Sequence, residues 1–257
     1  MSNSSATVKT SSREKVAALA PWFHNLHLPD GTQTAPDHTL GDFPACKWRA
    51  LAASVPADLS GRSVLDVGCN AGFYSFELAR RGAHVTAIDV NPHYLRQAEW
   101  VAREYGLQDR VSFRRTQIYA LGRESEAYDL VWFMGVFYHL RYPQLALDLL
   151  RRKTRRLMMF QTLTMPGEAV LSTPHNIGLL ERELMENSGW PKMAFIEHRL
   201  ANDPTNWWAP NHAAVEALLR SSGFRVLARP AHEVYWCETA EPHPLINEEM
   251  QSVFSFA

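Results

Sequence analysis

Two acids and a glycine-rich turn are the residues of this sequence best suited to build a ligand site. A strand-like apolar run that contains Asp66 leads into Gly68, Asn70 and Gly72, and an amphipathic stretch follows at 73–81. Glycine removes a side chain where a ligand must press against the backbone, and a helix N-terminus presents free N–H groups to that ligand. This order of elements is typical of a nucleotide-type cofactor site at the end of a strand.

The details of the turn indicate which cofactor to expect. The dinucleotide fingerprint G-x-G-x-x-G is broken, because Asn70 stands at the middle glycine and the last glycine is displaced. Asparagine tolerates left-handed backbone, so the turn itself can be kept. The carboxylate of Asp66 would repel a pyrophosphate but would suit a ligand that carries a cation or an amine. We therefore expect S-adenosylmethionine.

A second acid lies where such a cofactor needs one. The strand-like segment 83–89 ends on Asp89, about 20 residues after the glycine turn, where an acid accepts hydrogen bonds from both ribose hydroxyls. Asp89 also precedes Asn91-Pro92, which fits a helix start, so it can serve both purposes. The alternative is an ordinary α/β turn whose acids only cap helices.

The most reactive side chains follow another apolar strand, which ends on Met134. Methyl transfer from a sulfonium is a single in-line displacement, so it depends on alignment and a dry site and needs neither a nucleophile nor a metal. We predict that Tyr138 places an aromatic face near the sulfonium and that His139 is a base for a hydroxyl or ring-nitrogen acceptor. Arg141 completes this candidate group and is better suited to binding a substrate anion or capping backbone. A structural or solvated role is the alternative for His139.

Other conspicuous residues have plainer explanations beside the functional ones. Gln117 and Ile118 stand at the end of a strand-like segment and could hold an adenine, although surface and core roles explain them equally well. The basic run 151–156 resembles a polyanion site, but cations at a helix end are favoured by the helix dipole, and we adopt that interpretation. Trp207-Trp208 could stack on a base or pack a lid on the core. No metal site is expected, because no metal-ligand spacing relates His175, His198 and His212.

Composition limits the class of protein. A chain of 257 residues accommodates one α/β core with an elaboration, and its net charge of −1 gives no field that attracts polyanions. Three cysteines without a C-x-x-C pair predict neither a zinc cage nor a disulfide framework and favour a reducing compartment. No signal peptide and no membrane helix of roughly 20 apolar residues is apparent. We expect a cytoplasmic protein with no membrane partner, and the oligomeric state is left open.

The elements that must position these residues alternate along the chain. Alternation of strands and helices predicts an α/β, Rossmann-like fold with a mostly parallel sheet and helices on both faces. We expect strands at 63–68, 84–89, 111–117, 128–134, 155–163, 224–227 and 233–238, and helices at 72–81, 92–105, 143–153 and between Asn211 and Gly223. The expected divisions are a disordered tail (1–15), an N-terminal extension with short helices (16–60), a cofactor-binding core (61–164), an inserted cap (165–210), the C-terminal part of the core (211–240) and a C-terminal tail (241–257).

The glycine turn resembles the cofactor motif of the class I S-adenosylmethionine-dependent methyltransferases. More narrowly, residues 128–143, with Gln161-Thr162-Leu163 and 207–210, resemble the tRNA wobble-uridine carboxymethyltransferases, which use carboxy-S-adenosylmethionine on tRNA hydroxyuridine. The similarity runs from about Lys47 to Phe224. It implies cofactor contacts by Lys47, Gly68, Asp89, Gln117, Ile118, Met134 and Tyr138.

Two departures from that family affect the expected donor. Its Lys-Gly-Pro-Phe tract is not found around 22–25, and its basic C-terminal tail is replaced by 242–257. Both regions help that family to bind the extra carboxylate, and Lys47 is the partner that remains. We therefore expect methyl transfer from S-adenosylmethionine to a small or medium-sized acceptor under the cap. The alternatives are carboxymethyl transfer to tRNA and a non-catalytic module that only binds the cofactor.

Overall fold

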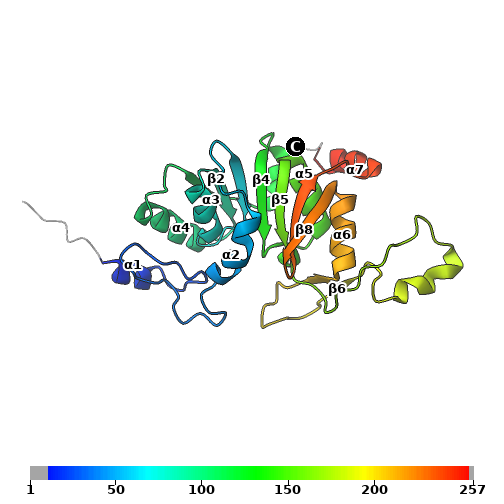
Figure 1. The fold of residues 1–257 in the computed structure, drawn as a ribbon, viewed down its shortest axis with the longest axis horizontal. Coiled ribbons are helices and arrows are strands. Elements are labelled where there is room, and N and C mark those ends of the chain that lie inside the picture. Colours follow the sequence, from blue (N-terminus) through cyan, green and yellow to red (C-terminus); the bar gives the residue numbers. More distant parts are fainter. Residues whose placement is uncertain (1–10, 255–257) are drawn as a thin grey trace, which may run out of the picture.

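A seven-stranded sheet forms the centre of the protein, with its strands side by side in Figure 1. The structure is a computed structural model that describes residues 11–254, so most of the expected N-terminal tail lies outside the described residues. The strands lie in the order β3 (Val111–Arg115), β2 (His84–Asp89), β1 (Ser63–Val67), β4 (Tyr128–Met134), β5 (Thr154–Gln161), β9 (Val234–Thr239) and β8 (Phe224–Ala231).

Most of the sheet is parallel, as the alternation of elements predicts. The pairs from β3 through β5 are parallel, whereas β9 runs antiparallel to both of its neighbours, β5 and β8. The chain moves outward from β1 through β2 to β3 and then returns to place β4 on the other side of β1. Reversal of strand order at β1 and β4 opens a crevice beyond their C-terminal ends, where ligands bind in such sheets.

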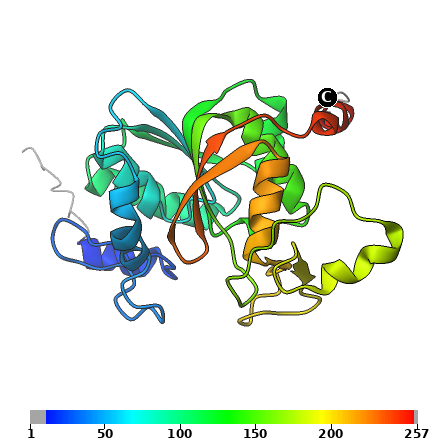
Figure 2. The ribbon, with the colours of Figure 1, turned by 45° about the vertical axis from the view of Figure 1, so that its right-hand side comes forward.

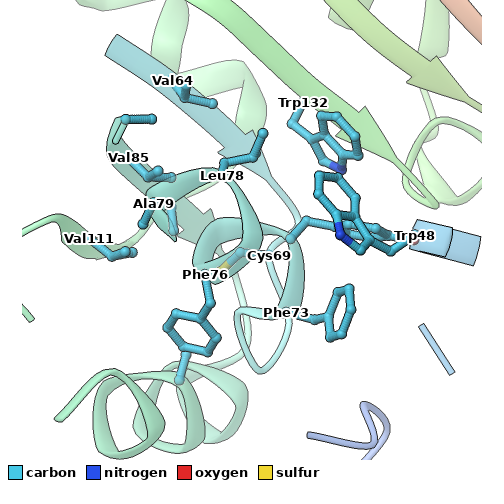
Figure 3. Close-up of a cluster of buried hydrophobic side chains, with 14 of the residues drawn as sticks. Trp48, Val64, Cys69, Phe73, Phe76, Leu78, Ala79, Val85, Val111 and Trp132 are labelled. Atoms are coloured by element: carbon cyan, nitrogen blue, oxygen red, sulfur yellow. The ribbon is translucent and has the colours of Figure 1, made fainter. Parts of the chain in front are cut away.

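Alternating side chains divide the core into one layer on each face of the sheet. On β4, Leu130 and Trp132 belong to one buried cluster, whereas Val131 and Phe133 belong to the other. This period of two is what a strand buried on both faces requires. Figure 3 shows the first cluster, in which the ring of Trp132 meets Trp48 of the N-terminal extension at 5.8 Å between centroids.

Helices cover both layers. The first cluster includes residues of α3 (Phe73–Arg80) and α4 (Pro92–Glu104), and the second includes residues of α5 (Pro143–Lys153) and α6 (His212–Ser221). Polar side chains determine where two of these helices begin. Asn91 accepts a hydrogen bond from the His93 backbone at α4, and Asn211 accepts one from Ala214 at α6. Asn91, and not Asp89, is therefore the capping residue of α4.

The N-terminal extension is more ordered than the sequence suggested. Helix α1 (Ser12–Ala18) begins inside the expected tail, with a capping box between Ser11 and Glu14. One of the short helices expected in this extension is α2 (Ala45–Leu51), which continues into the short 3-10 helix η1 (Ala52–Ser54). Helix α1 buries no residue completely, which explains why apolar periodicity failed to mark its start.

The cap, residues 165–210, contains little regular structure. Strands β6 (Met193–Phe195) and β7 (Trp208–Pro210) pair antiparallel, and the 3-10 helix η4 (Leu179–Glu186) lies in an arm that projects from the body in both views (Figures 1 and 2). Two more 3-10 helices, η2 (Ile118–Arg123) and η3 (Phe137–His139), follow β3 and β4. The expected C-terminal tail carries a helix, α7 (Pro244–Phe254). No helix within residues 11–254 combines the length and apolarity needed to cross a bilayer.

Candidate functional site

A cavity of about 660 Å³ opens at the C-terminal ends of β1, β2 and β4. Its volume is in the range of roughly 300–1,000 Å³ typical of small-molecule and cofactor sites. Most of the site residues predicted from the sequence meet there: the cavity is lined by Lys47, Asp66, Gly68, Asn70, Asp89, Gln117, Ile118, Met134, Tyr138 and His139. Gly72 and Arg141 do not line it. The topological switch point of the sheet is thus also the place where the candidate residues converge.

The glycine turn has the backbone shape that its residue types predicted. Gly68, Asn70 and Gly72 all have positive φ, at 73°, 51° and 87°. A side chain at Gly68 would collide with Val136, and one at Gly72 would collide with Phe76. Gly68 forms cavity wall, whereas Gly72 allows α3 to pack behind it.

Asp89 is held at the cavity wall by the turn itself. One carboxylate oxygen, Oδ2, accepts a hydrogen bond from the Asn70 backbone at 2.9 Å, and Oδ1 accepts one from the Asn91 backbone at 2.8 Å. Burial raises the pKa of this carboxyl, and the two backbone hydrogen bonds partly oppose the rise. A carboxylate has about four acceptor positions, so capacity remains for two ribose hydroxyls.

Asp66 lies deeper than Asp89. The residue is 2% exposed, and its carboxyl accepts a hydrogen bond from the Ser75 hydroxyl at 2.5 Å. Burial raises its pKa to about 7, and the charge of Asp89 adds to the rise. A bound cation would favour the ionised carboxylate, so the predicted contact with a cationic or amine-bearing ligand is electrostatically consistent. That contact stays a prediction.

Tyr138 and His139 occupy η3, directly after β4. Burial raises the pKa of Tyr138 to about 12, so its hydroxyl stays protonated at neutral pH. Burial lowers the pKa of His139, and the charge of Asp203 partly opposes the decrease. The imidazole is therefore neutral at neutral pH and has one nitrogen able to accept a proton.

Hydrogen bonds from the cap identify that nitrogen. Nδ1 of His139 lies 2.9 Å from Oγ1 of Thr205, and this hydroxyl in turn lies 2.6 Å from Oδ1 of Asp203. An ionised carboxylate only accepts, so the Thr205 hydroxyl donates to Asp203 and accepts from the Nδ1–H of His139. The tautomer follows from this chain of donors: Nε2 of His139 carries the lone pair and is the atom suited to act as a base.

The cap also fixes the backbone of this turn. The Trp207 backbone donates to the Tyr138 carbonyl at 2.9 Å, and the Trp208 indole donates to the Leu140 carbonyl at 3.1 Å. Arg141 points into the cap instead of the cavity, with its guanidinium 5.0 Å from the ring centroid of Trp207. Trp207 and Trp208 thus hold cap against core, as one of the two sequence interpretations expected. The role considered for Arg141, binding a substrate anion or capping backbone, stays a prediction.

The N-terminal extension supplies part of the cavity wall. Lys47 enters the cavity from α2, and its ammonium lies 5.6 Å from the ring centroid of Phe43. Burial lowers the pKa of Lys47, whereas the nearby carboxylate of Glu233 favours the charged form. Glu233 itself is held in left-handed backbone, with φ 62°, and accepts hydrogen bonds from the backbone and hydroxyl of Thr164 at 2.7 and 3.0 Å.

Sequence reasoning missed several residues of the site. Asp203 and Thr205 line the cavity although they come from the cap, and Glu233 faces Lys47 from the turn between β8 and β9. Asp203 and Thr205 form a local polar turn, with the Thr205 backbone donating to Asp203 at 2.7 Å. Such turns are common in loops, so no sequence pattern connects this one to His139.

The basic run 151–156 lies away from the cavity. It falls at the end of α5 and the start of β5, and β5 spans about 23 Å at 3.3 Å per residue before its far end reaches the cavity at Gln161. Local partners bind two of these cations. Arg151 donates to the Ala240 carbonyl at 3.0 Å, and Lys153 donates to the carbonyl of Glu124.

Comparison with known proteins agrees with this geometry. Residues 64–157 match the family described as "Methyltransferase domain". The tRNA U34 carboxymethyltransferase of Shewanella piezotolerans is 32% identical over 191 residues, which cover 67% of this chain and 57% of that protein. The enzyme of the same name from Pseudomonas aeruginosa is 28% identical over 224 residues, which cover 87% of this chain and 62% of that protein. The chain thus spans less than two thirds of these relatives.

Solved structures show the same fold at lower sequence identity. The SAH-bound N-terminal domain of EvdMO1 superposes with a TM-score of 0.63 at 21% identity, covering 92% of this chain and all of that domain. The [4+2]-cyclase SpnF superposes with a TM-score of 0.53 at 17% identity, covering 89% and 91% of the two chains. Because a protein named as a cyclase also has this fold, the chemistry must be argued from the residues of the site.

Proposed function

The chain carries a methyltransferase domain with the class I fold, and we propose that it transfers a methyl group from S-adenosylmethionine to a small or medium-sized acceptor. The observation that carries the proposal is the convergence of Asp89, the Gly68 turn, Tyr138 and His139 on one cavity at the strand ends. The groups there suit an adenosyl cofactor: the rigidly held carboxylate of Asp89, a glycine that allows close approach and the half-buried aromatic ring of Tyr138.

Each lining residue has a task that its surroundings permit. Asp89 would bind the ribose hydroxyls, and Gln117 with Ile118 would hold the adenine. When bound, S-adenosylmethionine supplies a methyl group on a sulfonium, which an acceptor takes by in-line displacement. The ring of Tyr138 favours a cation near its face, and Nε2 of His139 takes the proton that the acceptor loses.

The surroundings of the cavity favour a compact acceptor. The N-terminal extension contributes Phe23, Leu40 and Phe43, and the cap contributes Asp203 and Thr205, so the cavity has walls on both sides of the strand ends. The basic run 151–156, the densest positive charge in the sequence, lies at the other end of β5. If the target base of a tRNA entered this cavity, the tRNA would have to extend across the length of the sheet to contact the cations of this run.

Carboxymethyl transfer to tRNA is the second candidate, because the curated relatives carry that name and Lys47 lines the cavity. A carboxylated donor would bury a negative charge that needs a paired cation. Here Glu233 already supplies a negative charge near Lys47. A second carboxylate would be repelled by Glu233, so the site favours the plain donor.

Calorimetric titration of both donors against the wild-type protein tests this preference. We expect S-adenosylmethionine to bind at least as tightly as its carboxylated form. Glu233→Gln should improve binding of the carboxylated donor more than binding of the plain one. Two results together would contradict the proposal and make tRNA the first acceptor to test. The wild type would strongly prefer the carboxylated donor, and Lys47→Ala would weaken binding of that donor by about 3–5 kcal/mol.

A transfer assay separates an enzyme from a module that only binds the cofactor. The protein is incubated with methyl-labelled S-adenosylmethionine and, separately, with a small-molecule extract and a tRNA fraction. We expect label in the small-molecule fraction. Label confined to tRNA would favour the second candidate, and donor binding without transfer to either fraction would favour the module.

We also propose the cytoplasm as the compartment, because Cys46, Cys69 and Cys237 are free thiols.

A further inference from the structure

Three potential metal ligands from distant parts of the sequence meet behind the β8–β9 turn. They are Glu168 of the cap, His212 at the start of α6 and His232 of the turn, and their ligand atoms all lie within 4.8 Å of one another. Oε1 of Glu168 is 3.3 Å from Nε2 of His212 and 3.3 Å from Nδ1 of His232. Ligands of a tetrahedral zinc ion, at about 2.0–2.1 Å from the metal, are separated from one another by about 3.3 Å.

The tautomer of His212 suits metal binding. Its ring is fully buried, and Nε2 lies 3.0 Å from Nη2 of Arg229, which can only donate. In the tautomer whose Nε2 accepts from Arg229, the lone pair of Nε2 is directed into the cluster and Nδ1–H donates to the Tyr235 hydroxyl. A metal-binding histidine generally donates its other N–H to such a partner, which fixes the ring orientation.

The guanidinium of Arg229 occupies the place that a metal ion would take among these ligands. Nη2 of Arg229 donates to Glu168 at 2.7 Å as well as to His212. Its Nε is buried and has no hydrogen-bond partner among the described residues, so the guanidinium is incompletely satisfied there. The side chains of Glu168 and His232 are 63% and 68% exposed, which leaves an open approach from solvent.

We propose that Glu168, His212 and His232 form a binding site for a divalent transition-metal ion of the zinc class, which Arg229 vacates as the ion enters. Two imidazoles and one carboxylate are a ligand set that suits zinc and leaves a fourth position for water, whereas magnesium and calcium prefer oxygen ligands. The ion would link the cap to α6 and to the turn that carries Glu233, beside the cofactor cavity. This site is independent of the proposed methyl transfer.

The test is a titration of the metal-stripped full chain with Zn²⁺ against a chromophoric chelator. We expect one equivalent to bind to the wild type, with at least tenfold weaker binding in His232→Ala and Glu168→Gln. His198→Ala, which removes an exposed histidine elsewhere in the cap, is the matched control and should bind as the wild type does. Arg229→Gln should bind Zn²⁺ more tightly, because the competing cation is gone.

Two results would overturn the site. One is the absence of saturable binding at one equivalent in the wild type. The other is an equal loss of affinity in His232→Ala and His198→Ala. Both substituted histidines are exposed, so folding is expected to survive, and circular dichroism of each variant checks this. Excess Mg²⁺ should leave the Zn²⁺ titration unchanged, and competition by Mg²⁺ would contradict the assigned ligand class.

Discussion

The Nδ1 atom of His139 lies 2.9 Å from the hydroxyl of Thr205, which joins the turn after β4 to the cap. The hydroxyl of Thr205 in turn donates to Asp203, so the cap selects the tautomer in which Nε2 of His139 is unprotonated. The cap therefore does more than cover the cavity, because it sets the tautomer of the imidazole that we propose as the base. The match to a methyltransferase domain agrees with the chemistry expected from the sequence. The match to a tRNA U34 carboxymethyltransferase agrees with the resemblance that the sequence motifs indicated.

The pH dependence of methyl transfer should report His139. Because burial lowers its pKa below the ordinary value, the single-turnover rate should rise with pH through that lowered pKa and be level at neutral pH. Asp203 favours the imidazolium, so Asp203→Asn should move the acidic limb to still lower pH. Rapid-quench rates between pH 5 and 8 at saturating donor measure both effects. A profile without an acidic limb, together with an unchanged rate in His139→Ala, would rule out the base.

Loss of the Thr205 hydroxyl should reduce the plateau rate. In Thr205→Val the Nδ1–H of His139 loses its side-chain partner and keeps only the backbone carbonyl of residue 205, at 3.3 Å, so the tautomer with a lone pair on Nε2 is less strongly favoured. General bases contribute about 10²–10⁴-fold, and we expect part of that factor to disappear, about tenfold or more. Cofactor affinity, measured by calorimetry, should change little. An equal loss of affinity and rate would instead indicate damage to the cavity.

Asp89→Ala should weaken S-adenosylmethionine by about 2–4 kcal/mol, because the ribose hydroxyls lose a charged acceptor in a partly dry site. Asp89→Asn should cost less, since an amide oxygen can still accept a hydrogen bond from the Asn70 backbone. Calorimetry on both variants measures the difference, with exposed Asp58→Ala as the control. Unchanged affinity in folded Asp89→Ala would remove the ribose role.

Tyr138→Phe should lower turnover more than cofactor affinity. The ring still packs, and the cap still binds the backbone carbonyl of this residue, so the binding surface is retained. The lost hydroxyl, which stays protonated because burial raises the pKa of Tyr138 to about 12, no longer positions the donor or acceptor. Single-turnover rates and calorimetry on the same variant test this, and an unchanged rate would leave Tyr138 a packing residue.

Acid should destabilise the protein through His24 of the N-terminal extension. Burial lowers the pKa of His24 to about 3, whereas the unfolded chain titrates near 6.5. The unfolded state therefore binds the extra proton as pH falls below 6.5, and stability is lost progressively down to about pH 3. The full effect is roughly 3–5 kcal/mol. Urea unfolding at several pH values gives the free energy of unfolding as a function of pH. Between about pH 6.5 and pH 3 this free energy should fall less steeply in His24→Phe than in the control His84→Gln. Equal pH dependence in the two variants would contradict the assignment.

The sequence by itself determined the central sheet and most of the cofactor site. Strand β4 and helix α5 have the predicted bounds, because a strand buried on two faces and an amphipathic helix leave clear apolar patterns. The glycine turn, Asp89, Met134 and Tyr138 could be placed for a similar reason, since parallel strands bring their C-terminal ends to one edge. Weaker patterns failed: β8 continues to Ala231 along an exposed edge, and α7 was not expected.

Only the tertiary structure decided which residues act together across long stretches of chain. Thr205 contacts His139, the charge of Glu233 acts on Lys47, and the carboxylate of Glu168 lies against two histidines, although no spacing in the sequence relates these groups. Local periodicity reports which face of an element is buried, but it carries no information about which loops meet over that element. Those contacts depend on how the cap and the N-terminal extension pack around the strand ends, and that packing determines the tautomer of His139, the charge around Lys47 and the candidate metal site.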